Sequence, residues 1–396
     1  MSETSHVFSR QLAIYIHWPF CESKCPYCDF NSHVRNSFDY EKMGNAYIKE
    51  INTLQNLFPK ESKKIGSIFF GGGTPSLMPP ILVNKILSTL EECWGFTEQI
   101  EISIEANPNS TDTERLLGYR NAGVNRLSLG VQALNDKDLK FLGRTHSYSD
   151  SLRALDKAAG IFPRTSIDLI YGRPKQSTSD WELELATALQ LPVNHISLYQ
   201  LTIEKGTPFY TDDRSKKFIM PDDNVQTSMF EISNFLTENA GFKSYEVSNY
   251  ARPENMCQHN LAYWLYKPYV GIGPGAHGRI PVEKDSTGRI ATRMHSKPET
   301  WLEAVLSNGH GIAGQSLLTM KERASEALIL GLRLKIGINK KNFKYNTGVD
   351  IEETTISYEV ETMKAAGLIE ESDEFFRLTS KGRPLLNSIL SRIALN

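Results

Sequence analysis

The chain has 396 residues, which is enough for two or three domains and a large hydrophobic core. Its apolar fraction of 40%, charged fraction of 23% and formal net charge of -2 are those of an ordinary globular protein, without the excess charge that binds nucleic acid or an anionic membrane. No apolar run approaches the ~18 residues of a spanning helix, and the N-terminus has no secretory or transit pattern, so we expect a cytoplasmic protein without stable membrane insertion.

From residue 12 to residue 203, short apolar runs alternate with longer amphipathic segments. Repeated strand–helix–strand units predict a parallel α/β sheet, which is either doubly wound or closed toward a barrel. Because the candidate functional residues follow strand ends and must converge on one pocket, we favour a partial (β/α)6 TIM-like barrel. The predicted strands are 12–18, 65–71, 99–106, 126–132, 165–172 and 195–203, with helices over 40–58, 79–94, 112–123, 149–160 and 180–190.

The remaining chain divides into two further predicted domains. After a first domain over 1–210, an α/β extension is predicted over 211–310, where an aromatic, Gly-rich stretch follows a helix-like segment. A helical domain is predicted over 311–396, with a short hairpin at 367–379 that makes it similar to a winged helix. Winged helices bind DNA or serve as packing modules; because this one has no excess of Lys or Arg, we expect no nucleic-acid binding.

Three of the five cysteines, Cys21, Cys25 and Cys28, lie just after the first predicted strand with C-x3-C-x2-C spacing. One interpretation is a structural zinc site that is completed by Cys93, Cys257 or a histidine. The other is a [4Fe–4S] cluster held by three thiolates, with one iron left open for a small molecule. Structural zinc sites usually combine two C-x2-C pairs, and the chain has no second pair, so the spacing favours the cluster.

Two strand ends carry further candidates. Glycines 71–73 of "GGGTP" let a backbone with exposed amides approach the charged end of a ligand, although a tight turn without a ligand has the same pattern. Glu105 ends the third strand with a carboxylate that suits the hydroxyl groups of a ribose, or is simply solvated. "GIGPGAHG" over 271–278 contains G-x-G-x-x-G, but it lacks the strand–turn–helix context of a dinucleotide site.

"CQHNLAYW" over 257–264 is open to two interpretations. Neutral imidazole is a good iron ligand, so His259 could bind iron while Tyr263 and Trp264 stack on a planar ring. The alternative is an aromatic corner of the core that contains a hydrogen-bonded histidine. Cys257 could be a second axial or covalent partner, although a buried cysteine is usually just a small apolar residue, and His146 and His277 are alternative ligands.

The cysteine spacing, with Tyr27 before the last cysteine, resembles the signature of the radical S-adenosylmethionine (SAM) family. Within that family, the chain is similar to the branch of oxygen-independent coproporphyrinogen III oxidases and HemW-type haem chaperones. The resembling stretches occur in order over most of the chain: "YIHWPFCESKCPYCDF", "FFGGGTPSLM", "SIEANP", "GVNRLSLGVQALND", "LGRTHS", "SIDLIYGRPKQS", "SLYQLTIEKGTPF" and "GIGPGAHG".

The resemblance implies a [4Fe–4S] cluster on Cys21, Cys25 and Cys28 whose open iron is chelated by SAM. In the family, reduction of the cluster cleaves SAM to a 5′-deoxyadenosyl radical. The resemblance further implies that Gly72, Gly73 and Thr74 contact the methionine part of SAM, that Ile272 packs on its adenine, and that Gln132, Arg144 and Asp168 hold SAM or a second copy of it. Tyr15, Tyr27 and Glu105 are the other residues that it assigns to this site.

Three features distinguish the chaperone branch. The oxidases carry a fourth cysteine two residues after the third, where this chain has Phe30, and an additional segment before the first strand. H-N-x-x-Y-W, associated with haem binding in HemW, is matched by His259, Tyr263 and Trp264. The resemblance therefore implies a chaperone that transfers haem to a haem-requiring protein, for which we expect a membrane respiratory enzyme. An oxidase, or a radical SAM enzyme with an unrelated substrate, are the alternatives; whether the chain forms a homodimer stays open.

Overall fold

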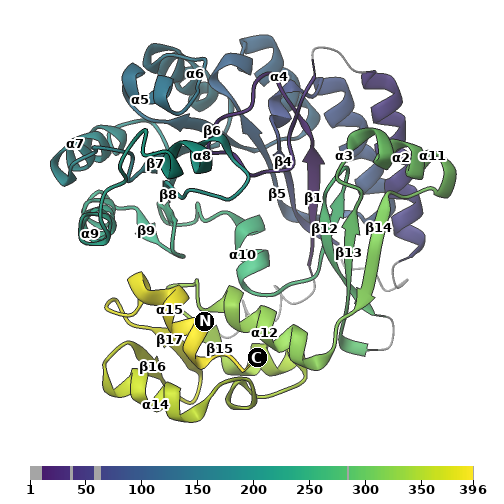
Figure 1. The fold of residues 1–396 in the computed structure, drawn as a ribbon. Helices are drawn as coiled ribbons and strands as arrows, with labels where there is room; N and C mark the ends of the chain where they lie inside the picture. Colours follow the sequence, from purple (N-terminus) through teal and green to yellow (C-terminus); the bar gives the residue numbers. More distant parts are fainter. Residues whose placement is uncertain (1–10, 36–38, 58–63, 283–284, 396) are drawn as a thin grey trace.

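A mixed sheet of twelve strands organises the described part of the chain, which in this computed structural model comprises residues 11–35, 39–57, 64–282 and 285–395. Its strand order is β14-β13-β12-β11-β1-β4-β5-β6-β7-β8-β10-β9. Figure 1 shows helices along the outside of this sheet, and the C-terminal helices as a separate group next to α10 and the lower ends of the strands.

Six parallel strands in the middle of this sheet lie side by side in the order in which they occur in the chain. Right-handed crossovers between such neighbours place every connecting helix on the same face, which is the winding of a barrel and not of a doubly wound sheet. The predicted partial barrel is confirmed. Its strands are β1 (Leu12–Trp18), β4 (Ile65–Gly72), β5 (Phe96–Ala106), β6 (Arg126–Gln132), β7 (Arg164–Tyr171) and β8 (His195–Gln200).

Most helices that connect these strands begin at a side chain that caps them; α3 begins after Pro79 without one. Asp39, Asp112, Ser147 and Ser177 each accept a hydrogen bond from a backbone amide in the first turn, which satisfies a donor that the helix itself leaves free. The apolar faces of the helices join the strands in one core. These helices are α2 (Tyr40–Asn56), α3 (Pro80–Trp94), α4 (Thr113–Ala122), α5 (Asp136–Phe141), α6 (Tyr148–Ile161) and α7 (Thr178–Ala188).

The segment predicted as an α/β extension contributes to both edges of the same sheet. On the β8 side, β10 and β9 add antiparallel strands, and α9 packs beside α7. On the β1 side, β11 pairs in parallel with β1 and is followed by an antiparallel meander. The elements are α8 (Pro208–Arg214), α9 (Asp223–Asn239), β9 (Lys243–Ser244), β10 (Asn249–Ala251), α10 (Gln258–Trp264), β11 (Tyr269–Ile272), β12 (His277–Val282), β13 (Asp285–Met294), α11 (Pro298–Asn308) and β14 (Ile312–Leu317).

The C-terminal region has its own hydrophobic core, built mainly from residues after 323. Three helices precede an antiparallel hairpin in which Ile369 pairs with Leu378, as the resemblance to a winged helix predicts. The elements are α12 (Met320–Gly331), β15 (Ile338–Asn339), α13 (Lys340–Thr347), α14 (Ser357–Ala365), β16 (Ile369–Glu371), β17 (Phe375–Leu378) and α15 (Leu386–Ile393).

The predicted domain boundaries at 210 and 310 stay predictions. The strand β14 follows the second boundary, yet it pairs with β13 at the edge of the large sheet. Among the described helices, none combines the length and the apolar character that a membrane crossing requires.

Candidate functional site at two ends of the barrel

The three cysteines lie on a loop beyond the carboxyl end of β1. A short parallel ribbon, in which β2 (Phe20–Cys21) pairs with β3 (His33–Val34), closes this loop at its base. Cys21 lies on the ribbon, whereas Cys25 and Cys28 lie in the loop, and all three thiols are partly exposed. The backbone amide of Cys28 donates to the carbonyl of Cys25 at 3.1 Å, which forms a turn between them.

Hydrogen-bond donors from two loops elsewhere in the chain approach these sulfur atoms. The Thr74 hydroxyl donates to Cys21 Sγ at 3.3 Å, and the Arg144 guanidinium donates to Cys25 Sγ at 3.4 Å. Burial raises the pKa of the Cys21 thiol, and the Thr74 bond opposes this rise. Three thiols with a hydroxyl and a guanidinium directed at them have the donor chemistry of a thiolate-held iron–sulfur cluster. In the described residues, no three His, Cys, Asp or Glu side chains are grouped closely enough to hold one metal ion.

The "GGGTP" loop at the end of β4 differs from its prediction. Its amides were expected to be exposed to a ligand, but the Gly73 and Thr74 amides donate to the Trp18 and Phe20 carbonyls at 2.7 and 2.9 Å. A Cβ atom on Gly73 would lie 2.7 Å from the Phe20 carbonyl oxygen, so only glycine permits this approach. Gly72 has φ +111°, and its amide hydrogen-bonds Glu105. These glycines therefore fix the cysteine loop against β1 and β4.

The interior of the barrel contains a polar cavity of about 130 Å³ that is lined by Tyr15, Glu105 and Asp168, among others. Burial, and then the charge of Asp168, raises the pKa of Glu105 to about 8. Ser128 donates to Asp168 at 3.2 Å, and the Arg126 guanidinium lines the same wall. The three predicted residues are thus brought together, and Glu105 is protonated near neutral pH.

Of the other residues predicted for SAM, Gln132 and Arg144 lie near the cysteine loop, whereas Ile272 and Tyr27 pack against apolar side chains. Gln132 ends β6 with φ +70°, an uncommon conformation for a residue other than glycine. Arg144 donates to the Gly130 carbonyl at 3.1 Å as well as to Cys25, so both lie near the cysteine loop. The side chain of Ile272 is 0% exposed within the main core, and its contact with an adenine stays a prediction. The ring of Tyr27 packs near Phe209.

The predicted haem residues lie at the opposite end of the barrel, on α10, which packs near the amino-terminal part of β4. The buried Glu101 carboxylate accepts from the amides of Gln258 and His259, both at 3.1 Å, and from the Cys257 thiol at 3.4 Å. Arg164 pairs with the same carboxylate at 2.8 Å. One buried acid therefore holds the first turn of α10 on the sheet, and Cys257 is a core residue.

Both ring nitrogens of His259 are engaged. Nδ1 hydrogen-bonds the Ser67 hydroxyl at 3.2 Å, and Nε2 hydrogen-bonds the Tyr263 hydroxyl at 3.1 Å. Burial, and then the charge of Arg126, lowers the pKa of His259 to about 3, so the imidazole is neutral. It lines the polar interior cavity. As the structure stands, His259 would have to release one of these partners before it could bind iron.

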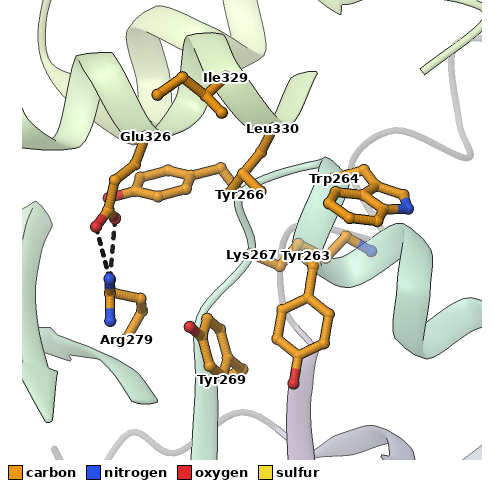
Figure 2. Close-up of a pocket in the computed structure, with 9 residues that line it drawn as sticks. All are labelled: Tyr263, Trp264, Tyr266, Lys267, Tyr269, Arg279, Glu326, Ile329 and Leu330. Atoms are coloured by element: carbon orange, nitrogen blue, oxygen red, sulfur yellow. Dashed lines mark hydrogen bonds and ion pairs between the residues drawn. The ribbon is translucent and has the colours of Figure 1, made fainter. Parts of the chain in front are cut away.

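Tyr263 and Trp264 face a second cavity, of about 290 Å³, between α10, β11, β12 and α12 (Figure 2). Its lining is predominantly aromatic and aliphatic, with Tyr266 and Tyr269 on the connection from α10 to β11. The Arg333 guanidinium lies 4.5 Å from the Trp264 ring centroid, and the buried Trp264 Nε1 has no hydrogen-bond partner among the described residues. Tyr263 therefore reaches both cavities, because its hydroxyl hydrogen-bonds His259 at the interior cavity, whereas His259 does not line the aromatic cavity.

Comparison with known proteins identifies the family from the sequence. The model of the Radical SAM superfamily matches residues 15–186, and that of the HemN C-terminal domain matches residues 318–385. The heme chaperone HemW of Escherichia coli (strain K12) is 34% identical over 382 residues, which are 96% of this chain and 97% of that protein. The mitochondrial radical S-adenosyl methionine domain-containing protein 1 of Bos taurus is 36% identical over 386 residues, 96% and 87% of the two chains.

The chain belongs to this radical SAM family, of the HemN and HemW type. Among solved structures, coproporphyrinogen III oxidase (HemN) from Escherichia coli superposes with a TM-score of 0.78 at 21% identity, covering 99% of this chain and 93% of that one. At this identity the likeness shows the fold, including the arrangement of barrel and C-terminal region.

Sequence reasoning missed three residues of these radical SAM sites. Glu101 interrupts the apolar run of its strand, and an acid between apolar positions of a buried strand was the signal that could have identified it. Arg279 and Glu326, which line the aromatic cavity, lie 47 positions apart in segments with many other charged residues. No local pattern distinguishes them, because their meeting depends on how the C-terminal region packs against β12.

Proposed function

We propose that the protein is a haem chaperone that binds haem and transfers it to a haem-requiring acceptor, with membrane respiratory enzymes as the acceptor class we expect. The observation that carries this proposal is that α10 presents Tyr263 and Trp264 to an aromatic cavity of about 290 Å³. A porphyrin is a large, flat, mostly apolar ring, and aromatic side chains stack on such rings favourably. Curated relatives that are named heme chaperones support it.

His259 has a different part in this proposal from the one expected from sequence alone. Its bond to the Tyr263 hydroxyl orients the ring that faces the cavity. We propose that Tyr263 and Trp264 receive the porphyrin, and that His259 reaches iron only after this bond opens. A neutral imidazole is the form that binds iron, so no proton has to leave the histidine first.

For the other end of the barrel, we propose that Cys21, Cys25 and Cys28 hold a [4Fe–4S] cluster next to a SAM site. When bound, a cluster with an open iron supplies one-electron reduction of SAM. The chain's own contributions are the donors at the sulfur atoms, Thr74 and Arg144, which stabilise negative charge there. Glu105, protonated near neutral pH, can donate to a hydroxyl or carboxylate of a ligand in the interior cavity.

The second candidate function is an oxygen-independent coproporphyrinogen III oxidase. The observation that favours it is the superposition on the Escherichia coli oxidase over nearly the whole chain. Against it stands Phe30, which occupies the position of the oxidases' fourth cysteine and has a side chain that is 61% exposed. The oxidase would couple SAM cleavage to loss of two CO2 from its porphyrinogen, whereas the chaperone would bind haem without changing it.

An anaerobic haem titration of the purified protein, followed by the Soret band, tests the proposal. We expect saturation near one haem per chain, weaker binding by Trp264→Ala, and an altered spectrum for Tyr263→Phe, which keeps the ring but frees His259. Tyr358→Ala is the matched control, because Tyr358 is a 78% exposed tyrosine of the C-terminal region. Absence of haem binding, or binding that none of the α10 variants changes, would overturn the proposal.

An oxidase assay with coproporphyrinogen III, SAM and a reductant separates the two candidates. Turnover by the reconstituted protein would favour the oxidase, and haem binding without turnover would favour the chaperone.

A further inference from the structure

An ion pair crosses one wall of the aromatic cavity. The Arg279 guanidinium on β12 donates to both carboxylate oxygens of Glu326 on α12, through Nε at 2.9 and 3.1 Å and through Nη2 at 2.6 Å (Figure 2). The Tyr266 hydroxyl donates to the same carboxylate at 2.9 Å. The side chains of Arg279 and Glu326 are 20% and 27% exposed, so solvent reaches the pair from the cavity side.

The charges of this cavity complement an acidic ligand. Arg279 and Lys267 line it together with a single acid, Glu326, while the remaining lining is aromatic or aliphatic. An aromatic slot with a guanidinium at one side suits a flat ring that carries carboxylates. Haem carries two propionates, so its chemistry matches both parts of the lining.

The volume of the cavity indicates that Arg279 and Glu326 separate when haem binds. At about 290 Å³ it is at the lower limit of ligand pockets, which range over roughly 300–1,000 Å³. Ile329 and Leu330 form the wall opposite β11, and they belong to α12, the same helix that carries Glu326. Separation of Arg279 from Glu326 would free this wall from β12 and make room for more of the porphyrin.

We propose that Arg279 binds a haem propionate and that Glu326 holds this position in the haem-free protein as an exchangeable carboxylate. This inference rests on the proposed haem-chaperone function. The exchange replaces one carboxylate on the guanidinium by another, so Arg279 is never left uncompensated in a partly buried site. The carboxylate of Glu326 then keeps the Tyr266 hydroxyl as its donor. Loading of haem thereby loosens one contact between the sheet and the C-terminal region.

The test compares haem with its dimethyl ester, which lacks the free carboxylates, in anaerobic Soret titrations of the full chain. Glu326→Gln removes the competing charge, and we expect it to bind haem roughly three- to tenfold more tightly. Arg279→Gln should bind haem about tenfold more weakly and bind the ester within twofold of the wild type. Arg377→Gln and Glu370→Gln are matched controls, since they form an exposed ion pair of the same kind within the C-terminal region.

The outcomes distinguish this inference from the function on which it rests. If the wild type binds haem and neither Arg279→Gln nor Glu326→Gln differs from the controls, the propionate site is wrong while the chaperone function stands. If Arg279→Gln weakens the binding of haem and the binding of its ester equally, Arg279 supports the fold and does not bind a propionate. Tighter haem binding by Glu326→Gln cannot arise from misfolding, so a gain of affinity in this variant supports the inference even if Arg279→Gln folds poorly. If the wild type binds no haem, both proposals are overturned.

Discussion

At the cysteine end of the barrel, a hydroxyl and a guanidinium are directed at partly exposed sulfur atoms, whereas at the α10 end the buried side chains of Glu101 and His259 already have protein partners. Thr74 and Arg144 donate to thiols. Glu101 and His259, by contrast, are fully engaged by amides, hydroxyls and Arg164. The first arrangement suits a bound anionic group, and the second suits a rigid scaffold behind an aromatic surface. The comparison predicts that the two ends can be disabled separately.

Replacement of a cluster cysteine should have the largest effect and should spare the other end. We expect Cys25→Ala to lose most of the about four iron atoms per chain that anaerobic reconstitution would otherwise introduce, as measured by iron and sulfide analysis. Haem affinity should stay within about twofold of the wild type, because α10 lies at the opposite end of the barrel from this loop.

Cys93→Ala is the control, since Cys93 lies on α3 away from the loop. Equal iron content in Cys25→Ala and Cys93→Ala would show that the C-x3-C-x2-C loop is not the iron site. Loss of haem binding together with iron would show that the two ends are coupled.

The second largest effect should follow from removal of the acid that holds α10. Glu101→Ala leaves three donors of α10 and the Arg164 guanidinium without their common acceptor. We expect a loss of roughly 2–4 kcal/mol in the free energy of unfolding, measured by urea denaturation, and weaker haem binding with iron binding retained. Glu370→Ala, at an exposed pair, should lose far less. Similar losses in both variants would show that α10 does not depend on Glu101.

The pattern of strands and helices was predictable because it is repeated and local. All six barrel strands lie within a few residues of their predicted positions, since apolar runs in a parallel sheet are buried on both faces and are easily recognised. The cysteine loop was equally clear, because its chemistry is contained in eight consecutive residues.

What the sequence could not provide was the set of contacts between distant segments. The amides of "GGGTP" were expected to face a ligand, but they bind the carbonyls of Trp18 and Phe20, which lie more than 50 positions earlier in the chain. His259 was expected to be available to iron, but Ser67, 192 positions away, occupies one of its nitrogens. The burial of Ile272 was not visible either, because it depends on the packing of α2 and β1 around it. Such pairings depend on tertiary packing, for which one sequence carries no local signal.

The cysteine end also rests on a buried acid, and this acid should give a pH-dependent effect of intermediate size. Glu50 on α2 accepts from the amides of Gly273 and Gly311 at 2.8 and 2.7 Å and from the Trp301 indole. Burial raises its pKa from 4.5 to about 7, despite these bonds. Between pH 4.5 and 7 the folded protein therefore holds a proton that the unfolded chain has released, so stability falls as the pH rises through this window.

We expect Glu50 to contribute a fall on the order of 1–3 kcal/mol to the free energy of unfolding between pH 5 and pH 8. In Glu50→Gln, which cannot ionise at this position, the free energy of unfolding should fall less over this pH range, by the same amount. In the exposed variant Glu370→Gln it should fall as in the wild type. Urea denaturation at several pH values measures the slopes. Parallel slopes for Glu50→Gln and the wild type would contradict a raised pKa at this position.

The smallest effect should come from a single hydrogen bond at the cysteine end, and it tests whether the donors there act on a bound cluster. Thr74→Val has nearly the shape of threonine but cannot donate to Cys21 Sγ. Hydrogen bonds to cluster sulfurs stabilise the more negative, reduced state, and their number is one determinant of the potential. Loss of a bond that contributes roughly 0.5–1.5 kcal/mol should lower a one-electron reduction potential by about 20–60 mV, with iron content unchanged.

Thr89→Val, on the exposed side of α3, is the control. The reduction potentials are measured by redox titration followed by electron paramagnetic resonance. Identical potentials for both variants would mean that the Thr74 hydroxyl supports only the loop. The contrast between the two ends would then rest on Arg144 alone.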